Sequence, residues 1–74
     1  MGGRLRRMTA REVETLLRNH GFELVSQKGS HQKWRHEAKS LQVIVPEHRG
    51  RTLPTGTLRN IFKTAEIPGG EWTS

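Results

Sequence analysis

Residues 22–36 read FELVSQKGSHQKWRH, and this stretch predicts a β-hairpin. Two runs of strand-forming and alternating polar residues flank the pair Gly29-Ser30. A glycine in the first position of a two-residue loop adopts the positive φ of a type II′ turn, whose twist matches that of paired antiparallel strands. We therefore expect one strand over 22–28 and the returning strand over 31–36.

The two-residue turn also sets the register of the hairpin, because paired residues share a face and side chains alternate along a strand. The pairs expected on one face are Lys28 with His31, Ser26 with Lys33, and Leu24 with Arg35. The pairs expected on the other face are Gln27 with Gln32, Val25 with Trp34, and Glu23 with His36. The Val25–Trp34 pair is the natural buried one, although a single bulge would exchange the faces. Since His31 and His36 then point to opposite sides, they are poor candidates for a shared metal or an acid/base pair.

A helix is expected before the hairpin. Thr9-Ala10-Arg11-Glu12 has the pattern of a capping box, in which the threonine hydroxyl and the glutamate carboxylate each accept from the other residue's backbone N–H. Apolar residues follow at helical spacing, at Val13, Leu16 and Leu17. Gly21 is suited to end this helix, because glycine takes a positive φ without steric cost.

A third strand and a second helix are expected after the hairpin. The run Leu41–Val45 is rich in β-branched residues, and Pro46 ends it. Either Thr52 or Thr55 is suited to cap the helix that follows. Its apolar stripe consists of Leu58, Ile61, Phe62 and Ala65. The segment Ile67-Pro68-Gly69-Gly70 is expected to stop it.

The order of elements is therefore α-β-β-β-α, and the fold class is α+β. The economical arrangement is a three-stranded antiparallel sheet with two helices packed on one face. We expect one domain over residues 9–70, preceded by a flexible basic lead over 1–8 and followed by a short tail over 71–74. In that tail, Trp72 either folds back on the core or stays exposed.

Length and charge limit the possible functions. The chain has 74 residues, with thirteen Lys and Arg against seven Asp and Glu, which gives a formal charge of +6. One small domain of this size cannot hold a large cofactor pocket, and its positive charge predicts a polyanionic partner. The sequence has no cysteine, which excludes a disulfide framework and a cysteine nucleophile. Since it also has no readable secretory signal or membrane-spanning run, we expect a cytoplasmic protein without membrane contact.

Four short motifs occur in the order typical of the HicA-type (YcfA-like) toxins. They are Gly21–Val25, Lys28–His31, Val43–Pro46 and Gly56–Ile61. Over about residues 8 to 68 the chain resembles this family. The resemblance implies a fold like that of double-stranded-RNA-binding domains. It also implies an mRNA interferase, an RNA endonuclease that blocks translation and growth, with a HicB-type antitoxin as the partner that masks its active site.

The resemblance assigns the family's functional histidine to His31, next to the turn residues Gly29 and Ser30. RNA carries its own nucleophile, because a deprotonated 2′-OH attacks the adjacent phosphorus without a metal. An imidazole ionises near neutral pH and can act as the base or the acid of such a reaction. Gly29 allows the RNA backbone to approach closely, and Ser30 either donates to phosphate or only shapes the turn. We expect no metal and no cofactor.

Cations for the RNA phosphates are expected at two places. The hairpin contributes Lys28, Lys33 and Arg35, whose simpler interpretation is a solvated basic face. Arg59 and Lys63 lie four apart on the second helix, whose N-terminus is a candidate phosphate seat or an ordinary cap. Two other functions stay open at this point: a non-catalytic RNA-binding module, and an interaction protein whose basic face docks an acidic protein.

Overall fold

The computed structural model describes residues 4–47 and 49–73, and its element order agrees with the predicted α-β-β-β-α. The elements are α1 (Ala10–Asn19), β1 (Glu23–Lys28), β2 (His31–His36), β3 (Leu41–Pro46), α2 (Thr55–Thr64) and a short 3-10 helix η1 (Gly69–Glu71). The strands form an antiparallel sheet in the order β1-β2-β3. The predicted fold class is confirmed.

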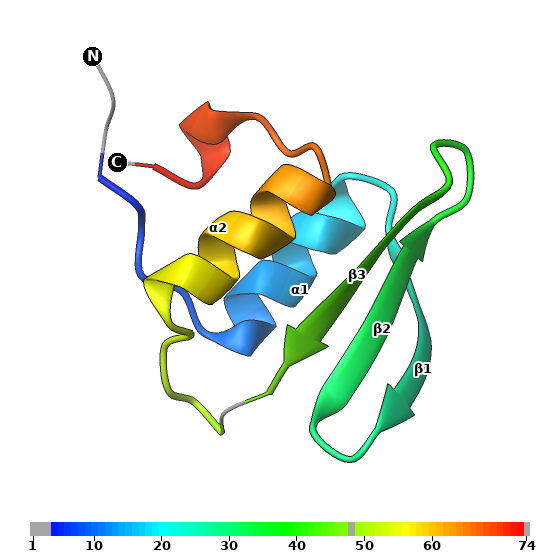
Figure 1. The fold of residues 1–74 in the computed structure, drawn as a ribbon, viewed down its shortest axis with the longest axis horizontal. Helices are drawn as coiled ribbons and strands as arrows, with labels where there is room; N and C mark the ends of the chain where they lie inside the picture. Colours follow the sequence, from blue (N-terminus) through cyan, green and yellow to red (C-terminus); the bar gives the residue numbers. More distant parts are fainter. Residues whose placement is uncertain (1–3, 48, 74) are drawn as a thin grey trace.

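Both helices lie on the same side of the sheet, as predicted, and both contact β3 (Figure 1). Alternate side chains of β2 and β3 are buried against them, while their neighbours on the other face are exposed. The buried set on the strands consists of Gln32, Trp34, Val43 and Val45. The predicted stripe of α2 is buried at all four positions, and the core contains Val13 and Leu17 from α1. The sheet therefore has one covered face and one open face.

The hairpin register is correct next to the turn and wrong beyond it. Lys28 pairs with His31, Gln27 with Gln32, and Ser26 with Lys33, as predicted. A bulge then leaves Val25 without a partner, so that Leu24 pairs with Trp34 and Glu23 with Arg35. The predicted pairs Val25–Trp34, Leu24–Arg35 and Glu23–His36 do not form.

Val25 is not buried, because the bulge shifts the register of the edge strand β1 relative to β2 by one residue. Its side chain is 51% exposed, whereas that of Trp34 is fully buried. The bulge lies in β1 alone, so the two faces of β2 are not exchanged. Trp34 stays buried in the core, and the bulge changes only which residue of β1 pairs with it.

The ends of α1 follow the sequence pattern. The Glu12 N–H donates to the Thr9 hydroxyl (3.3 Å), and the Thr9 N–H donates to the Glu12 carboxylate (2.9 Å). Gly21 has φ +88°, and the Phe22 N–H donates to the Leu17 carbonyl (3.0 Å). This hydrogen bond closes the helix and turns the buried Phe22 ring back toward the core.

The ends of α2 differ from the expectation. The N-cap is Pro54, with no side-chain hydrogen bond, so neither predicted threonine caps the helix. At the other end Glu66 adopts a left-handed φ of +57°, and the Ile67 N–H donates to the Phe62 carbonyl (3.0 Å). The same closing geometry as at Gly21 is thus built on a residue that carries a side chain.

The chain ends pack against each other and against the helices. Leu5 forms a bridge with Thr73, and the Arg6 N–H donates to the Trp72 carbonyl (3.0 Å). Met8 is only 3% exposed within the core. Residues 5–8 of the expected lead therefore pack against the rest of the domain, and Met8 supplies apolar surface that the short chain buries. The flexibility of the lead stays a prediction. Residues 1–3 lie outside the described residues.

The open question about Trp72 is answered by two contacts. Its ring stacks on that of Phe62, with 5.5 Å between the ring centroids, and its indole N–H donates to the Ile67 carbonyl (2.8 Å). Trp72 therefore covers the end of α2. Neither helix in the described part of the chain is long and apolar enough to cross a membrane.

Candidate active site

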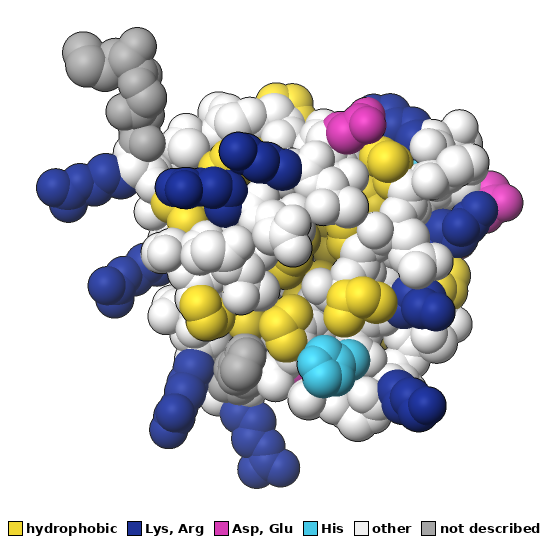
Figure 2. Space-filling view, viewed as in Figure 1, with side chains coloured by type: hydrophobic (Ala, Val, Ile, Leu, Met, Phe, Trp, Pro, Cys, Tyr) yellow, Lys and Arg dark blue, Asp and Glu magenta, His cyan; other side chains and the backbone are white. Residues whose placement is uncertain are grey.

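The open face of the sheet carries the residue expected to perform chemistry. His31, Lys33 and Arg35 alternate along β2 and point away from the helices, because their neighbours Gln32 and Trp34 are buried on the other face. Lys28 on β1 pairs directly with His31 across the turn. Figure 2 shows exposed histidine, Lys and Arg side chains on one face of the molecule. The structure therefore brings an imidazole and cations together on one accessible surface.

The turn next to His31 leaves room for a ligand. Of its two residues only Gly29 has a positive φ (+60°), as a type II′ turn requires. A Cβ at Gly29 would meet no other atom within 4 Å, so the space above this glycine is open. The Ser30 carbonyl accepts from the Glu47 N–H (2.7 Å), which ties the turn to the end of β3. A ligand can thus approach the turn next to His31, and the backbone of this turn is held in place.

The cations on this face differ in their surroundings. The Nε of Arg35 donates to the Glu37 carboxylate (3.0 Å), and the two side chains are 38% and 88% exposed. Among the described residues, no carboxylate pairs with Lys28 or Lys33. Lys28 and Lys33 are therefore the cations most accessible to a phosphate near His31.

The two cations predicted on α2 belong to another surface. Arg59 and Lys63 are exposed, but α2 covers the face of the sheet opposite to His31. They consequently do not form one cluster with Lys28 and Lys33. The N-terminal turn of α2 has no side-chain cap, which leaves its N–H groups without that partner.

The other described histidines have structural contacts. The Nε2 of His20 lies 2.7 Å from the Glu71 carboxylate and links α1 to η1. The His36 ring contacts Phe22 edge-on, and its Nδ1 accepts from the Lys39 N–H (3.1 Å). His48 lies outside the described residues. In residues 4–47 and 49–73, no group of three His, Asp or Glu side chains has the arrangement of a metal site.

A series of hydrogen bonds from buried side chains, not expected from the sequence, connects the core to the residue after β3. The Trp34 indole N–H donates to the Gln32 side-chain oxygen (3.1 Å), and the Gln32 side-chain nitrogen donates to the Glu47 carboxylate (3.0 Å). Gln32 is only 5% exposed. Because Gln32 and Trp34 alternate with Lys33 along β2, the sequence indicated that Gln32 faces the core. It contains no signal for the contact of Gln32 with Glu47, fifteen residues away.

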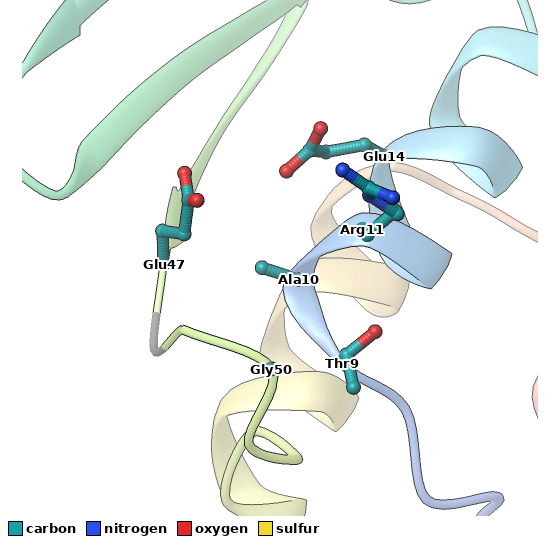
Figure 3. Close-up of a pocket in the computed structure, with 6 residues that line it drawn as sticks. All are labelled: Thr9, Ala10, Arg11, Glu14, Glu47 and Gly50. Carbon is teal, nitrogen blue, oxygen red and sulfur yellow. The ribbon is translucent and has the colours of Figure 1, made fainter.

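Glu47 stands between two pockets. One, of about 360 Å³, is lined by Thr9, Ala10, Arg11, Glu14, Glu47 and Gly50, and Figure 3 shows the Glu14 carboxylate extending from α1 into it toward the segment that carries Glu47. The other, of about 330 Å³, lies beside the turn and is lined by Gln27, Gly29, Ser30, Glu47 and Arg49. The second pocket shares the residues that precede His31, so it adjoins the candidate active site.

Comparison with known proteins identifies the family. No curated protein matches the chain. The family model described as "HicA toxin of bacterial toxin-antitoxin" matches residues 10–67, which includes both helices and all three strands of the described structure. The chain therefore belongs to the HicA toxins of bacterial toxin–antitoxin systems.

Proposed function

We propose that this toxin is a ribonuclease that cleaves mRNA, with His31 as its catalytic residue. Family membership gives the role of toxin and implies an antitoxin as partner. The observation that carries the proposal is the position of His31, exposed on the open face, beside an unobstructed glycine turn and next to Lys28 and Lys33.

The chemistry needs few protein groups, because the substrate supplies the nucleophile. His31 accepts the proton of a ribose 2′-OH, or delivers a proton to the leaving 5′-oxygen. The 2′-oxygen forms a bond to phosphorus while the bond from phosphorus to the 5′-oxygen breaks. The products are a cyclic phosphate and a free 5′-hydroxyl. No metal takes part in this proposed reaction.

Lys28 and Lys33 are the residues proposed to hold the reacting phosphate. Both are exposed on β-strands next to His31, and a nearby ammonium group stabilises the negative charge that develops on phosphate oxygens. Arg35 is a weaker candidate, since its guanidinium already pairs with Glu37. Arg59 and Lys63 are proposed to contact RNA only beyond the reacting phosphate, because they lie on α2.

A HicB-type antitoxin is the proposed partner, and the open face is the surface that it would cover. Ile44 lies on this face in the edge strand β3, where it pairs with Lys33 of β2, and it is 45% exposed. An acidic segment with an apolar residue matches this combination of charge and apolar surface. Such a partner would block access to His31. Cleavage of mRNA places the proposed activity in the cytoplasm.

Expression of the parent chain, His31→Ala and His31→Gln tests the proposal. The parent should arrest growth and fragment RNA, whereas both variants should lose about a hundredfold or more in cleavage rate, as expected when an acid/base group is removed. His31→Gln keeps a polar side chain but cannot carry the proton. His20→Ala is the matched control, since it removes an imidazole on the helical side of the molecule.

Two results would contradict the proposal. If His31→Ala cleaves RNA as fast as the parent, the histidine is not catalytic. If the parent binds RNA in a salt-dependent manner but leaves it intact, the protein is a non-catalytic RNA-binding module.

A further inference from the structure

In the pocket beside the turn, Glu47 is held by hydrogen bonds of both its backbone and its side chain. The Glu47 backbone N–H donates to the Ser30 carbonyl (2.7 Å), and its carboxylate accepts from the buried Gln32 side chain (3.0 Å). The Gln32 oxygen is occupied by the Trp34 indole N–H (3.1 Å), so the amide nitrogen must face Glu47. A core residue thereby aims the Glu47 carboxylate next to the residue that precedes His31.

We propose that Glu47 reads the nucleobase next to the cleaved phosphate and selects bases with an exocyclic amino group against uracil. This inference rests on the proposed function of His31. The pocket is lined by Gln27, Gly29, Ser30, Glu47 and Arg49.

The groups in this pocket favour a base over a phosphate. A carboxylate repels phosphate, and the charges of Glu47 and Arg49 cancel each other. Gln32 uses one of the roughly four lone-pair sites that a carboxylate offers, so Glu47 can accept further hydrogen bonds. The Gln27 amide nitrogen donates to the Gly29 carbonyl (3.1 Å), which leaves its oxygen as a second acceptor. Arg49 supplies a planar guanidinium on which a base can stack.

Acceptors of this kind distinguish the bases by their donors. Cytosine presents its N4 amino group and adenine its N6 amino group, and carboxylates accept from such groups. Guanine offers N–H donors on its pairing edge. Uracil has a single N–H between two carbonyl oxygens, which would face the negative charge of Glu47. Uracil is therefore the base that the pocket disfavours.

The pocket lies around the tip of the hairpin from His31, because Gln32, which holds the Glu47 carboxylate, points to the covered face of the sheet. His31 and Pro46 are cross-strand partners, so Glu47 follows the residue that stands beside the proposed catalytic histidine. The tip of the hairpin includes Gly29, where a Cβ would meet nothing within 4 Å, and Gly29 also lines the pocket. A nucleotide whose phosphate lies at His31 would therefore pass around this tip at Gly29 to place its base in the pocket.

Binding of 2′-O-methyl oligonucleotides of cytidine and of uridine tests the inference without cleavage, because the nucleophile is blocked. The two pyrimidines have the same ring size and differ at the exocyclic group that the pocket reads. The parent should bind the cytidine oligomer about tenfold more tightly, in the range that one good base contact gives. Glu47→Gln should abolish this ratio, since the new amide can still accept from Gln32 and also donates to a uracil carbonyl.

Glu14→Gln is the matched control, because it removes the same charge from the adjoining pocket, which does not include the turn. It should keep the preference for cytidine. Equal binding of both oligomers by the parent, or an unchanged preference in Glu47→Gln, would overturn the inference. Failure of the proposed function has a different signature, since unmodified RNA would then stay intact while the preference for cytidine in binding persists.

Discussion

Replacement of Gly21 by alanine should reveal how tightly the site's supporting strand is fixed to α1. Gly21 has φ +88°, and a Cβ there would lie 2.9 Å from the Nε2 of His36. The His36 ring cannot move away freely. It contacts Phe22 edge-on, with 5.3 Å between the ring centroids, and its Nδ1 accepts from the Lys39 N–H (3.1 Å).

The expected loss of stability follows from three contributions. A side chain in the left-handed region costs about 1–2 kcal/mol. Lower entropy of the unfolded chain offsets about 0.4–1 kcal/mol of that loss. Displacement of the His36 ring weakens a hydrogen bond worth about 1 kcal/mol and an aromatic contact worth about 0.5–1.5 kcal/mol. We therefore expect Gly21→Ala to lower the free energy of unfolding by about 2–3 kcal/mol.

Gly29→Ala is the matched control, because it has a similar φ of +60° but open space around its Cβ. It should cost only about 1 kcal/mol. Urea unfolding of both variants, and of Gly21→Ala combined with His36→Ala, measures the difference. In the His36→Ala background the cost of Gly21→Ala should fall to about 1 kcal/mol, because the obstacle is gone. An undiminished cost in that background would refute the steric argument.

Two further predictions concern stability and RNA contact. Glu66→Gly should raise the melting temperature by roughly 3–6 °C, since glycine relieves the left-handed φ of +57° at the end of α2; an unchanged or lower value in thermal unfolding would contradict this. Lys33→Ala should weaken RNA binding and reduce the slope of log affinity against log salt concentration by about one. Lys39→Ala, which removes the same charge from the turn after β2, should leave that slope unchanged, and an equal effect of both variants would show that Lys33 makes no local phosphate contact.

The position of His31 could be predicted from the sequence because it depends on a short loop. The register next to a two-residue turn is set by the turn itself, so Lys28, His31 and Lys33 lie on the expected strands. Farther from the turn this control is lost, and the bulge at Val25 shifts the register. The bulge lies beside Trp34, whose indole is buried in a core that includes residues far from it in the sequence.

The face on which the hairpin cations lie could be predicted from the sequence, but their ion pairs could not. Alternation along β2 correctly indicated that Lys33 and Arg35 share the face of His31. The ion pair of Arg35 with Glu37 required the structure, whereas the position of Arg59 on the second helix was expected from the sequence. A pattern of basic residues does not say which charges are neutralised by a neighbour or which surfaces coincide.

Local sequence patterns predicted the order of elements, the capping box at Thr9, the end of α1 at Gly21 and the turn before His31. These features depend on hydrogen bonds and steric limits within a few residues of the chain. Three other features depend on packing between distant segments: Met8 joins the core, Trp72 stacks on Phe62, and buried Gln32 holds Glu47 beside the turn. Such contacts join segments that are distant in sequence. They form because a chain of 74 residues buries apolar side chains from all its segments in one small core, and a local pattern does not specify which segments meet there.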